Sequence, residues 1–360
     1  MLISHLTRML VVTVFLFAFG TTQASSHQEW LIFPQIDLIY RNDAVHPTSP
    51  KKREAAASVD FFYSSDHNEI KWLAELFASE NETGFERLMI GWSPRDNTTI
   101  WLGRFHNPLG FWNSLSHHGD YMQTAISRPH IIEYEHDGGS LPNHLSGVQA
   151  QITHSTDNGF WSYDIALGYG PELNTQLKAL DLLSPGSTEN DLGATFRISY
   201  KQGAYASNKI GLFASKQTTP IRNSIYQEVD QSILGITSIW SWQTTEMIGA
   251  IYYFDNQLTG ANNNPQNSFT SAYIQFDHTW RPAWAVYLRQ ESGTLKSEDP
   301  YSQWFPDILR NRTAIGLRHE LTIHQALKFE VRTNAHYDDN FAQRNDDFTE
   351  FQFQWSAFFP

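Results

Sequence analysis

The feature that most constrains this chain is an alternation of apolar and polar residues that recurs from one end to the other. In the segment "LGATFRISYK", Leu192, Phe196 and Tyr200 share one parity, and Arg197 and Lys201 share the other. Successive side chains of a β-strand point to opposite faces, so this pattern predicts strands with one apolar and one polar face. Charges at alternate positions in mid-strand favour a water-filled lumen over the interior of a soluble sandwich.

About sixteen segments carry this alternation, each near the ten-residue length that a tilted membrane strand needs. We predict strands at 32–41, 55–64, 70–79, 85–93, 99–106, 145–154, 160–169, 192–201, 209–217, 231–242, 246–255, 268–278, 283–292, 312–321, 326–336 and 348–359. Helical periodicity is weak, and Leu173 to Leu183 is the one stretch with a helical pattern.

The connections between these segments alternate in length. Short ones such as "SSDHNE", "QTT" and "TIHQ" alternate with long ones such as "NDAVHPTSPKKRE" and the run 107–144. Short turns on one rim and long loops on the other are typical of outer-membrane barrels. We therefore predict an all-β fold, a transmembrane antiparallel up-and-down β-barrel of about 16 strands, with both termini at the periplasmic rim.

The N-terminus has the pattern of a secretory signal peptide over residues 1–24. Arg8 gives a short basic region and Met9 to Gly20 is apolar. Thr22 and Ala24 are small residues at the two positions that a signal peptidase reads, so cleavage is expected after Ala24. Residues 25–360 would then form the barrel. The chain has no cysteine, which excludes a disulfide-rich secreted scaffold. Its net charge of −13 argues against a nucleic-acid partner.

Tryptophan positions support a membrane boundary at one rim. Trp30, Trp112 and Trp304 fall in predicted loops or before the first predicted strand. The other nine lie beside predicted short turns: Trp72, Trp92, Trp101, Trp161, Trp240, Trp242, Trp280, Trp284 and Trp355. Tryptophan favours the membrane–water interface, so this set predicts an aromatic girdle.

Taken together, the signal peptide, the strand number, the alternating loops and the aromatic last strand resemble the porins of Gram-negative outer membranes. The final strand, with Phe351, Phe353, Trp355 and Phe359, is similar to the C-terminal assembly signal of such barrels, although Pro360 follows the last aromatic. The resemblance implies an outer-membrane location, contact with lipid and lipopolysaccharide, assembly by the barrel assembly machinery, and a homotrimer.

A shorter resemblance concerns "TIWLGRFHNPLGFWN", which is similar to a segment of the phosphate-selective porins. The chain lacks that class's series of pore lysines, so the resemblance does not imply phosphate selectivity. In porins, a long loop after the fifth strand folds into the lumen and narrows it, which implies the same for 107–144. The implied constriction comprises Arg104, His117, His118, Asp120, Arg128, Glu133, Glu135, Asp137, Arg197 and Arg332. Arginines of the wall would face the carboxylates of the loop across the gap.

The expected function is a passive channel for small hydrophilic solutes and ions, with no catalytic residue, cofactor or metal. One alternative is a surface receptor or metal-capture barrel that uses the histidines of the loop region, although no clean ligand spacing appears among them. They are His106, His117, His118, His130, His136 and His144. The other alternative is a hydrolase using Ser116 and His117, which is disfavoured because neighbours on a strand face opposite ways.

Overall fold

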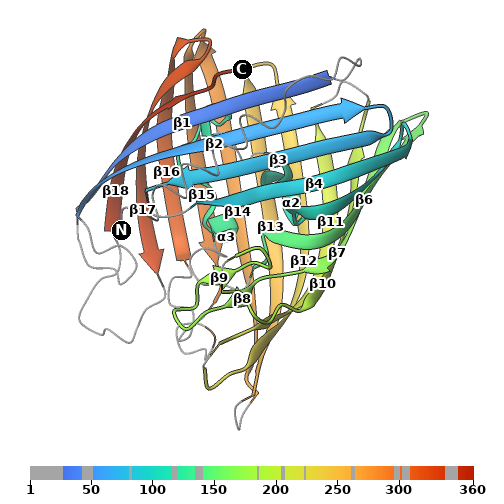
Figure 1. Cartoon of the computed structure of the whole chain (residues 1–360). Helices are drawn as coiled ribbons and strands as arrows, with labels where there is room; N and C mark the ends of the chain where they lie inside the picture. Colours follow the sequence, from blue (N-terminus) through green and yellow to red (C-terminus); the bar gives the residue numbers. More distant parts are fainter. Residues whose placement is uncertain are drawn as a thin grey trace, which may run out of the picture.

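The structure is a computed structural model that describes residues 27–42, 52–80, 83–115, 120–133, 141–184, 186–203, 207–222, 224–260, 264–295, 301, 309–336 and 348–360. The expected signal peptide lies outside these residues. Antiparallel strands close into a barrel in the order β1-β18-β17-β16-β15-β14-β13-β12-β11-β10-β7-β6-β5-β4-β3-β2 (Figure 1). The predicted barrel of about sixteen strands is confirmed.

Most strands pair with their neighbours in sequence. Their bounds extend most of the predicted segments by a few residues, but β3 and β10 match the prediction, β15 is shifted by one residue, and β18 ends two residues earlier than predicted. They are β1 (His27–Arg41), β2 (Arg53–His67), β3 (Ile70–Ser79), β4 (Thr83–Arg95), β5 (Thr98–His106), β6 (His144–Thr156), β7 (Gly159–Tyr169), β10 (Leu192–Lys201), β11 (Lys209–Pro220), β12 (Glu228–Trp242), β13 (Thr245–Thr259), β14 (Gln266–Arg281), β15 (Trp284–Gly293), β16 (Leu309–Thr322), β17 (Gln325–His336) and β18 (Phe348–Ala357).

Several short connections are tighter than the sequence suggested. The turn between β2 and β3 is only two residues long, and its Asn68 has a φ of 56°. Gln243 and Ala283 occupy corresponding turns with φ values of 48° and 66°. Two-residue hairpin turns require positive φ because their twist must match that of the strands. Placing Trp30 before the first strand was wrong, since β1 begins at His27.

The barrel closes where the last strand pairs with the first. Leu38 lies opposite Phe353 and Ile36 opposite Trp355 in the register of β1 and β18. Beyond β18, Phe359 exchanges two backbone hydrogen bonds of 2.9 Å with Ile32. Pro360 therefore does not disturb the closure, because the pairing of the C-terminus ends one residue before it. A closed sheet leaves no unpaired edge, as a bilayer requires.

The outer face of the barrel is apolar, as the alternation predicted. Leu102, Leu212 and Leu234 are each more than half exposed. Most of the predicted girdle tryptophans point outward as well, but Trp101 does not, because it packs against the buried Met89 cluster and donates a hydrogen bond to Gln151. This outer face provides an apolar belt of the kind that contacts lipid.

The interior differs from the expected polar lumen over part of its circumference. The largest apolar cluster of the described residues lies inside the barrel, where Leu109, Trp112 and Ile131 of the long loop pack against Tyr252 and Phe254 of β13. The helical pattern at Leu173 to Leu183 was misleading, because this stretch contains the paired short strands β8 (Glu172–Leu173) and β9 (Ala179–Leu180). None of the helices in the described part of the chain is long and apolar enough to cross a membrane.

The two faces of the last strand allow a direct test of the membrane orientation. Phe353 is 41% exposed on the outer face, whereas Gln352 is buried inside and lies opposite Glu330. Phe353→Lys should reduce the folded fraction in lipid, because a lysine on the lipid face costs up to about 2–4 kcal/mol, depending on its depth. Gln352→Lys is the matched control, since its ammonium would lie beside Glu330 and Glu350. Heat-modifiable gel mobility measures the folded fraction, and equal losses in both variants would contradict the assigned faces.

Candidate functional site

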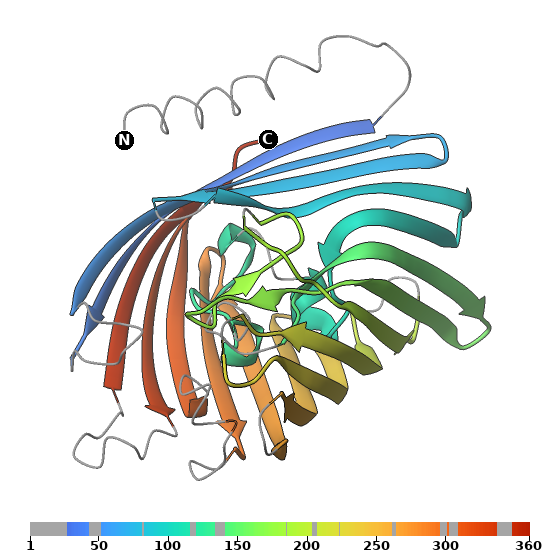
Figure 2. The ribbon, with the colours of Figure 1, turned by 60° about the horizontal axis from the view of Figure 1, so that its bottom comes forward.

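The connection between β5 and β6 turns into the barrel rather than away from it. It contains α2 (Gly110–Leu115), η1 (Asp120–Met122) and α3 (His130–Glu133), all of which lie within the ring of strands (Figure 2). The Phe111 amide donates a 3.1 Å hydrogen bond to Thr237 Oγ1 on β12. Gly110 has a φ of 83° and lies so near Tyr252 that a Cβ there would come within 2.6 Å of its hydroxyl. The loop therefore packs directly on the β12–β13 wall.

Buried charges of the wall bind the backbone of this loop. Glu330 on β17 accepts hydrogen bonds from the amides of Ile126 and Ser127, at 3.1 and 2.9 Å, and one of 2.5 Å from the Ser127 hydroxyl. Arg289 on β15 donates to the carbonyl oxygens of Ser127 and Arg128, at 2.8 and 3.0 Å. A loop without regular structure must find partners for its backbone, and here fully buried ionised side chains supply them.

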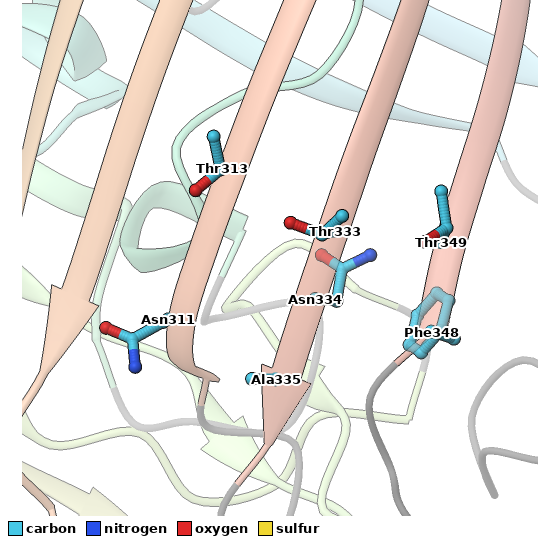
Figure 3. A pocket seen from close by; sticks show the side chains of 7 residues that line it. All are labelled: Asn311, Thr313, Thr333, Asn334, Ala335, Phe348 and Thr349. Atoms are coloured by element: carbon cyan, nitrogen blue, oxygen red, sulfur yellow. The ribbon is translucent and has the colours of Figure 1, made fainter.

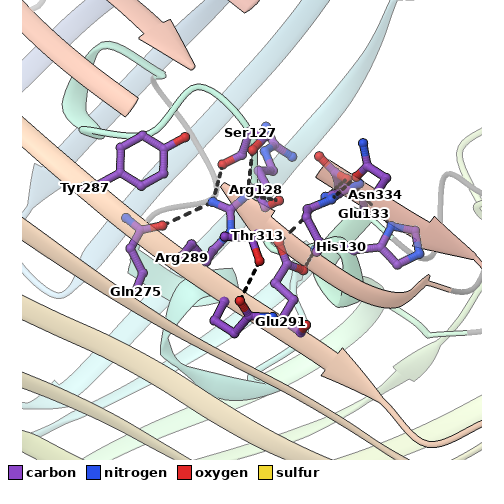
Figure 4. A network of polar contacts seen from close by, with 12 residues as sticks. Ser127, Arg128, His130, Glu133, Gln275, Tyr287, Arg289, Glu291, Thr313 and Asn334 are labelled. Atoms are coloured by element: carbon purple, nitrogen blue, oxygen red, sulfur yellow. Dashed lines mark hydrogen bonds and ion pairs between the residues drawn. The ribbon is translucent and has the colours of Figure 1, made fainter. Parts of the chain in front are cut away.

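The same attachment continues along the loop in both directions. Glu291 accepts a 2.6 Å hydrogen bond from the His130 amide, beside the Arg289 contacts (Figure 4). Lys328 donates to the Ala125 carbonyl at 3.2 Å, and Arg318 donates to the Tyr121 and Gln123 carbonyls. Side chains from β15, β16 and β17 thus hold successive loop residues against one side of the lumen.

Glu133 at the end of α3 completes this contact. Its carboxylate lies 3.2 Å from the Arg312 guanidinium of β16. Burial acts to raise the pKa of Glu133, but Arg312, together with His130 and Arg332, outweighs it and holds that pKa well below its ordinary value of 4.5. Glu133 therefore remains a carboxylate at neutral pH. Arg312 was absent from the residues proposed from sequence, because nothing in its own strand identifies its partner in the loop.

The arginines proposed from sequence have specific partners. Arg104 forms an ion pair with Asp181, and Arg332 lies 2.5 Å from Glu350. Arg197 lies 2.8 Å from Asp164 and also donates 2.6 and 2.7 Å hydrogen bonds to Gly110 O and Ser114 Oγ of α2. Arg197 therefore positions α2, and of these three arginines only Arg332 acts on Glu133.

Arg128 is the one arginine or lysine between residues 107 and 144. Its carbonyl accepts a hydrogen bond from Arg289, and its charge is the weakest of those that act on Glu75 of β3. Glu75 in turn accepts a 2.8 Å hydrogen bond from Arg87 of β4. His117, His118, Glu135 and Asp137 lie outside the described residues, as does the side chain of Asp120.

A second segment, residues 170–191 with β8 and β9, lies across the mouth of the barrel (Figure 2). Glu172 anchors it, forming an ion pair with Arg222 and accepting a 2.9 Å hydrogen bond from the Thr188 amide. Asp181, just after β9, binds Arg104 at the end of β5. The sequence analysis did not predict that this segment lies across the mouth of the barrel.

The base of the inward loop has an internal symmetry in sequence. Residues 106–109 read "HNPL", and residues 141–144 read "LPNH". The Asn107 amide donates to the Asn143 carbonyl at 2.8 Å, and Asn113 Nδ2 donates to the carbonyls of Asn107 and Asn143. The mirrored motif therefore closes the loop where it leaves and rejoins the wall. This repeat is the sequence signal that could have located the base of the loop.

A hollow at the end of β16–β18 opposite the short turns is a poor candidate site. It is lined by Asn311, Thr313, Thr333, Asn334, Ala335, Phe348 and Thr349 (Figure 3). No charged side chain lines it, so it offers no strong recognition group for an ionic solute.

The fold is that of outer-membrane porins. The chain is similar to an anion-selective porin from Comamonas acidovorans, with 12% identity, a TM-score of 0.65, and coverage of 93% of this chain and 100% of the other. It is also similar to the outer membrane channel DcaP of Acinetobacter baumannii (10%, 0.63, 95% and 100%) and to Salmonella typhi OmpF in complex with daunomycin (9%, 0.60, 92% and 97%). No family model and no curated protein matches the sequence. The closed barrel, its apolar belt and this fold place the protein in an outer membrane.

The attachment of the loop can be tested at Glu330. Glu330→Ala removes the acceptor of three loop hydrogen bonds and leaves buried cations uncompensated, which costs about 3–5 kcal/mol. Amide hydrogen exchange of residues 120–133 should accelerate while the strands remain protected. Asp230→Ala is the control, because Asp230 accepts its hydrogen bond from Thr218 of the neighbouring strand rather than from the loop. Unchanged exchange in the Glu330 variant would contradict the attachment.

The contact between Glu133 and Arg312 predicts a specific pH dependence. Because the pKa of Glu133 is depressed in the folded state, its contribution persists above 4.5 and is lost only as the pH falls through the lowered value. Protection of α3 should therefore be unchanged between pH 7 and pH 4.5. In Arg312→Gln, less positive charge offsets the effect of burial, so the pKa of Glu133 should rise. Protection of α3 should then be lost at a higher pH than in the parent protein. Identical pH profiles in the two proteins would show that Arg312 does not hold this carboxylate.

Proposed function

We propose that the protein is a passive channel for small hydrophilic solutes and ions across the outer membrane. The observation that carries this proposal is the loop between β5 and β6, which is held inside a closed sixteen-stranded barrel by buried charges. A barrel of this strand number is wide enough for a water-filled lumen. The loop then narrows that lumen without filling it.

The geometry supports selection by size and by charge. Loop residues and the apolar cluster around Tyr252 occupy part of the lumen beside β12 and β13, so solutes would pass through the remaining part. Charged groups of the loop and of the wall, among them Arg128 and the Glu75–Arg87 pair, would act on a solute that passes. Such charges produce a local field inside the lumen, which favours narrow and dipolar or charged solutes. The segment with β8 and β9 adds a second filter at the mouth.

Partners follow from the membrane location. The apolar belt would contact lipid and lipopolysaccharide, and insertion would require the barrel assembly machinery. One similar structure is a trimer form of OmpT from Vibrio cholerae, with 7% identity and a TM-score of 0.60. A homotrimer is therefore part of the proposal. A rim hydrolase receives no support from the described residues, since Ser116 and His117 lie outside them.

Removal of the loop is the most direct test of the channel. Deletion of residues 114–140 should raise the single-channel conductance in planar bilayers, because it removes the part of the loop that narrows the lumen. Deletion of residues 341–346, in a different connection, should leave conductance unchanged. A loop deletion that folds, shown by heat-modifiable mobility, and conducts like the parent would place the constriction elsewhere.

Charge variants test the selectivity independently of size. Replacing Glu133, Glu135 and Asp137 with their amides should shift the reversal potential in a salt gradient toward anion preference. Arg128→Gln should shift it the opposite way, because it removes the one arginine or lysine between residues 107 and 144. Shifts of the same sign in both variants, or none in either, would contradict the proposed field.

A further inference from the structure

Two histidines flank the inward loop and face each other across its base. His106 is the last residue of β5, His144 is the first residue of β6, and the two are direct partners in the register of these strands. Their rings meet edge to face with centroids 5.0 Å apart. The hydrogen bonds of Asn107 and Asn113 fix the backbone on both sides of the pair. The imidazoles are therefore held by a rigid base.

A carboxylate from a third strand completes the group. Glu86 of β4 places its Oε2 3.0 Å from Nε2 of His144, and one ligand atom from each of Glu86, His106 and His144 lies within 4.8 Å of the others. Tetrahedral zinc, about 2.0–2.1 Å from each ligand, needs ligand atoms about 3.3 Å apart, so the group must close by at most about 1.5 Å. Two imidazoles and one carboxylate are a ligand set that zinc and other late divalent transition metals accept.

The position of the group distinguishes it from a lipid-facing surface and from the apolar interior. His106 and His144 alternate with Phe105 and Leu145, which pack in the apolar cluster with Met89. His106 and His144 lie on the same face of their strands as the exposed Leu102 and Val148, but both histidines are buried. Asp181, through its pair with Arg104, brings the segment after β9 over this face. The Glu86 side chain keeps 18% of its surface exposed, which leaves an approach for an ion.

We propose that Glu86, His106 and His144 form a binding site for a divalent transition-metal ion, with zinc as the best match. The ion would link β4, β5 and β6 and so hold together the two ends of the inward loop. Metal binding to the folded state stabilises that state by mass action, so the bound ion would stabilise the base of the inward loop. This inference does not depend on the proposed channel function.

Zinc titration of the full-length, untagged protein in detergent tests the site. We expect one zinc ion per chain in competition with a chromogenic chelator, and a higher temperature of unfolding with zinc than without it. Glu86→Gln and His144→Gln should each weaken binding by roughly tenfold or more, since even ligand-supporting residues contribute 10–100-fold. Heat-modifiable mobility establishes that each variant remains a folded barrel.

Two controls make the assignment specific. His154→Ala removes an exposed histidine elsewhere on β6 and should leave affinity unchanged. A combined variant lacking His117, His118 and His136 should also bind like the parent. Loss of binding only in that combined variant would overturn the proposal and place the site in the loop itself. Absence of one-equivalent binding in the parent would show that the group is only a hydrogen-bonded histidine–glutamate contact.

Discussion

Every backbone polar group needs a hydrogen-bond partner, and this constraint determines both the closure of the wall and the attachment of the loop between β5 and β6. In the wall, closure of β18 onto β1 pairs the edge that would otherwise face lipid. In the lumen, the loop between β5 and β6 has little regular structure, so buried side chains of the wall replace the missing backbone partners. Glu330 binds two consecutive amides, and Arg289 binds two consecutive carbonyls. The position of the loop inside the barrel therefore depends on buried charged side chains of the wall.

Those hydrogen bonds also explain how charged side chains can be buried inside the barrel. Arg289, Glu291 and Glu330 are buried, and ionised groups in such a setting are stable only when paired and hydrogen-bonded. The loop backbone supplies part of that compensation, so loop and wall stabilise each other. The Glu75–Arg87 pair lies within range of Arg128. The charges of β15 and β17 thus hold the loop against the wall, and the Glu75–Arg87 pair is a separate charged contact inside the barrel.

The barrel was predictable from sequence because side-chain alternation is a local property. In β10, for example, the alternation of Phe196 outside and Arg197 inside already indicates in the sequence which face points outward. The pattern fails where both faces are apolar, as at Tyr252, Tyr253 and Phe254 of β13, so the apolar half of the lumen was not anticipated. The sequence also could not identify the wall residues that bind the loop. Glu330 lies 203 residues from Ser127 in sequence, and only the curvature of the closed sheet brings them together.

The central claim is that the loop between β5 and β6 narrows the conducting path, and a single introduced thiol tests it most directly. The chain has no native cysteine, so Arg128→Cys places a unique thiol on the inward loop. Addition of a bulky water-soluble methanethiosulfonate during single-channel recording should lower the current in discrete steps, whereas the parent protein should not respond. Full modification of the introduced thiol, verified by mass spectrometry, without any change in current would contradict this account.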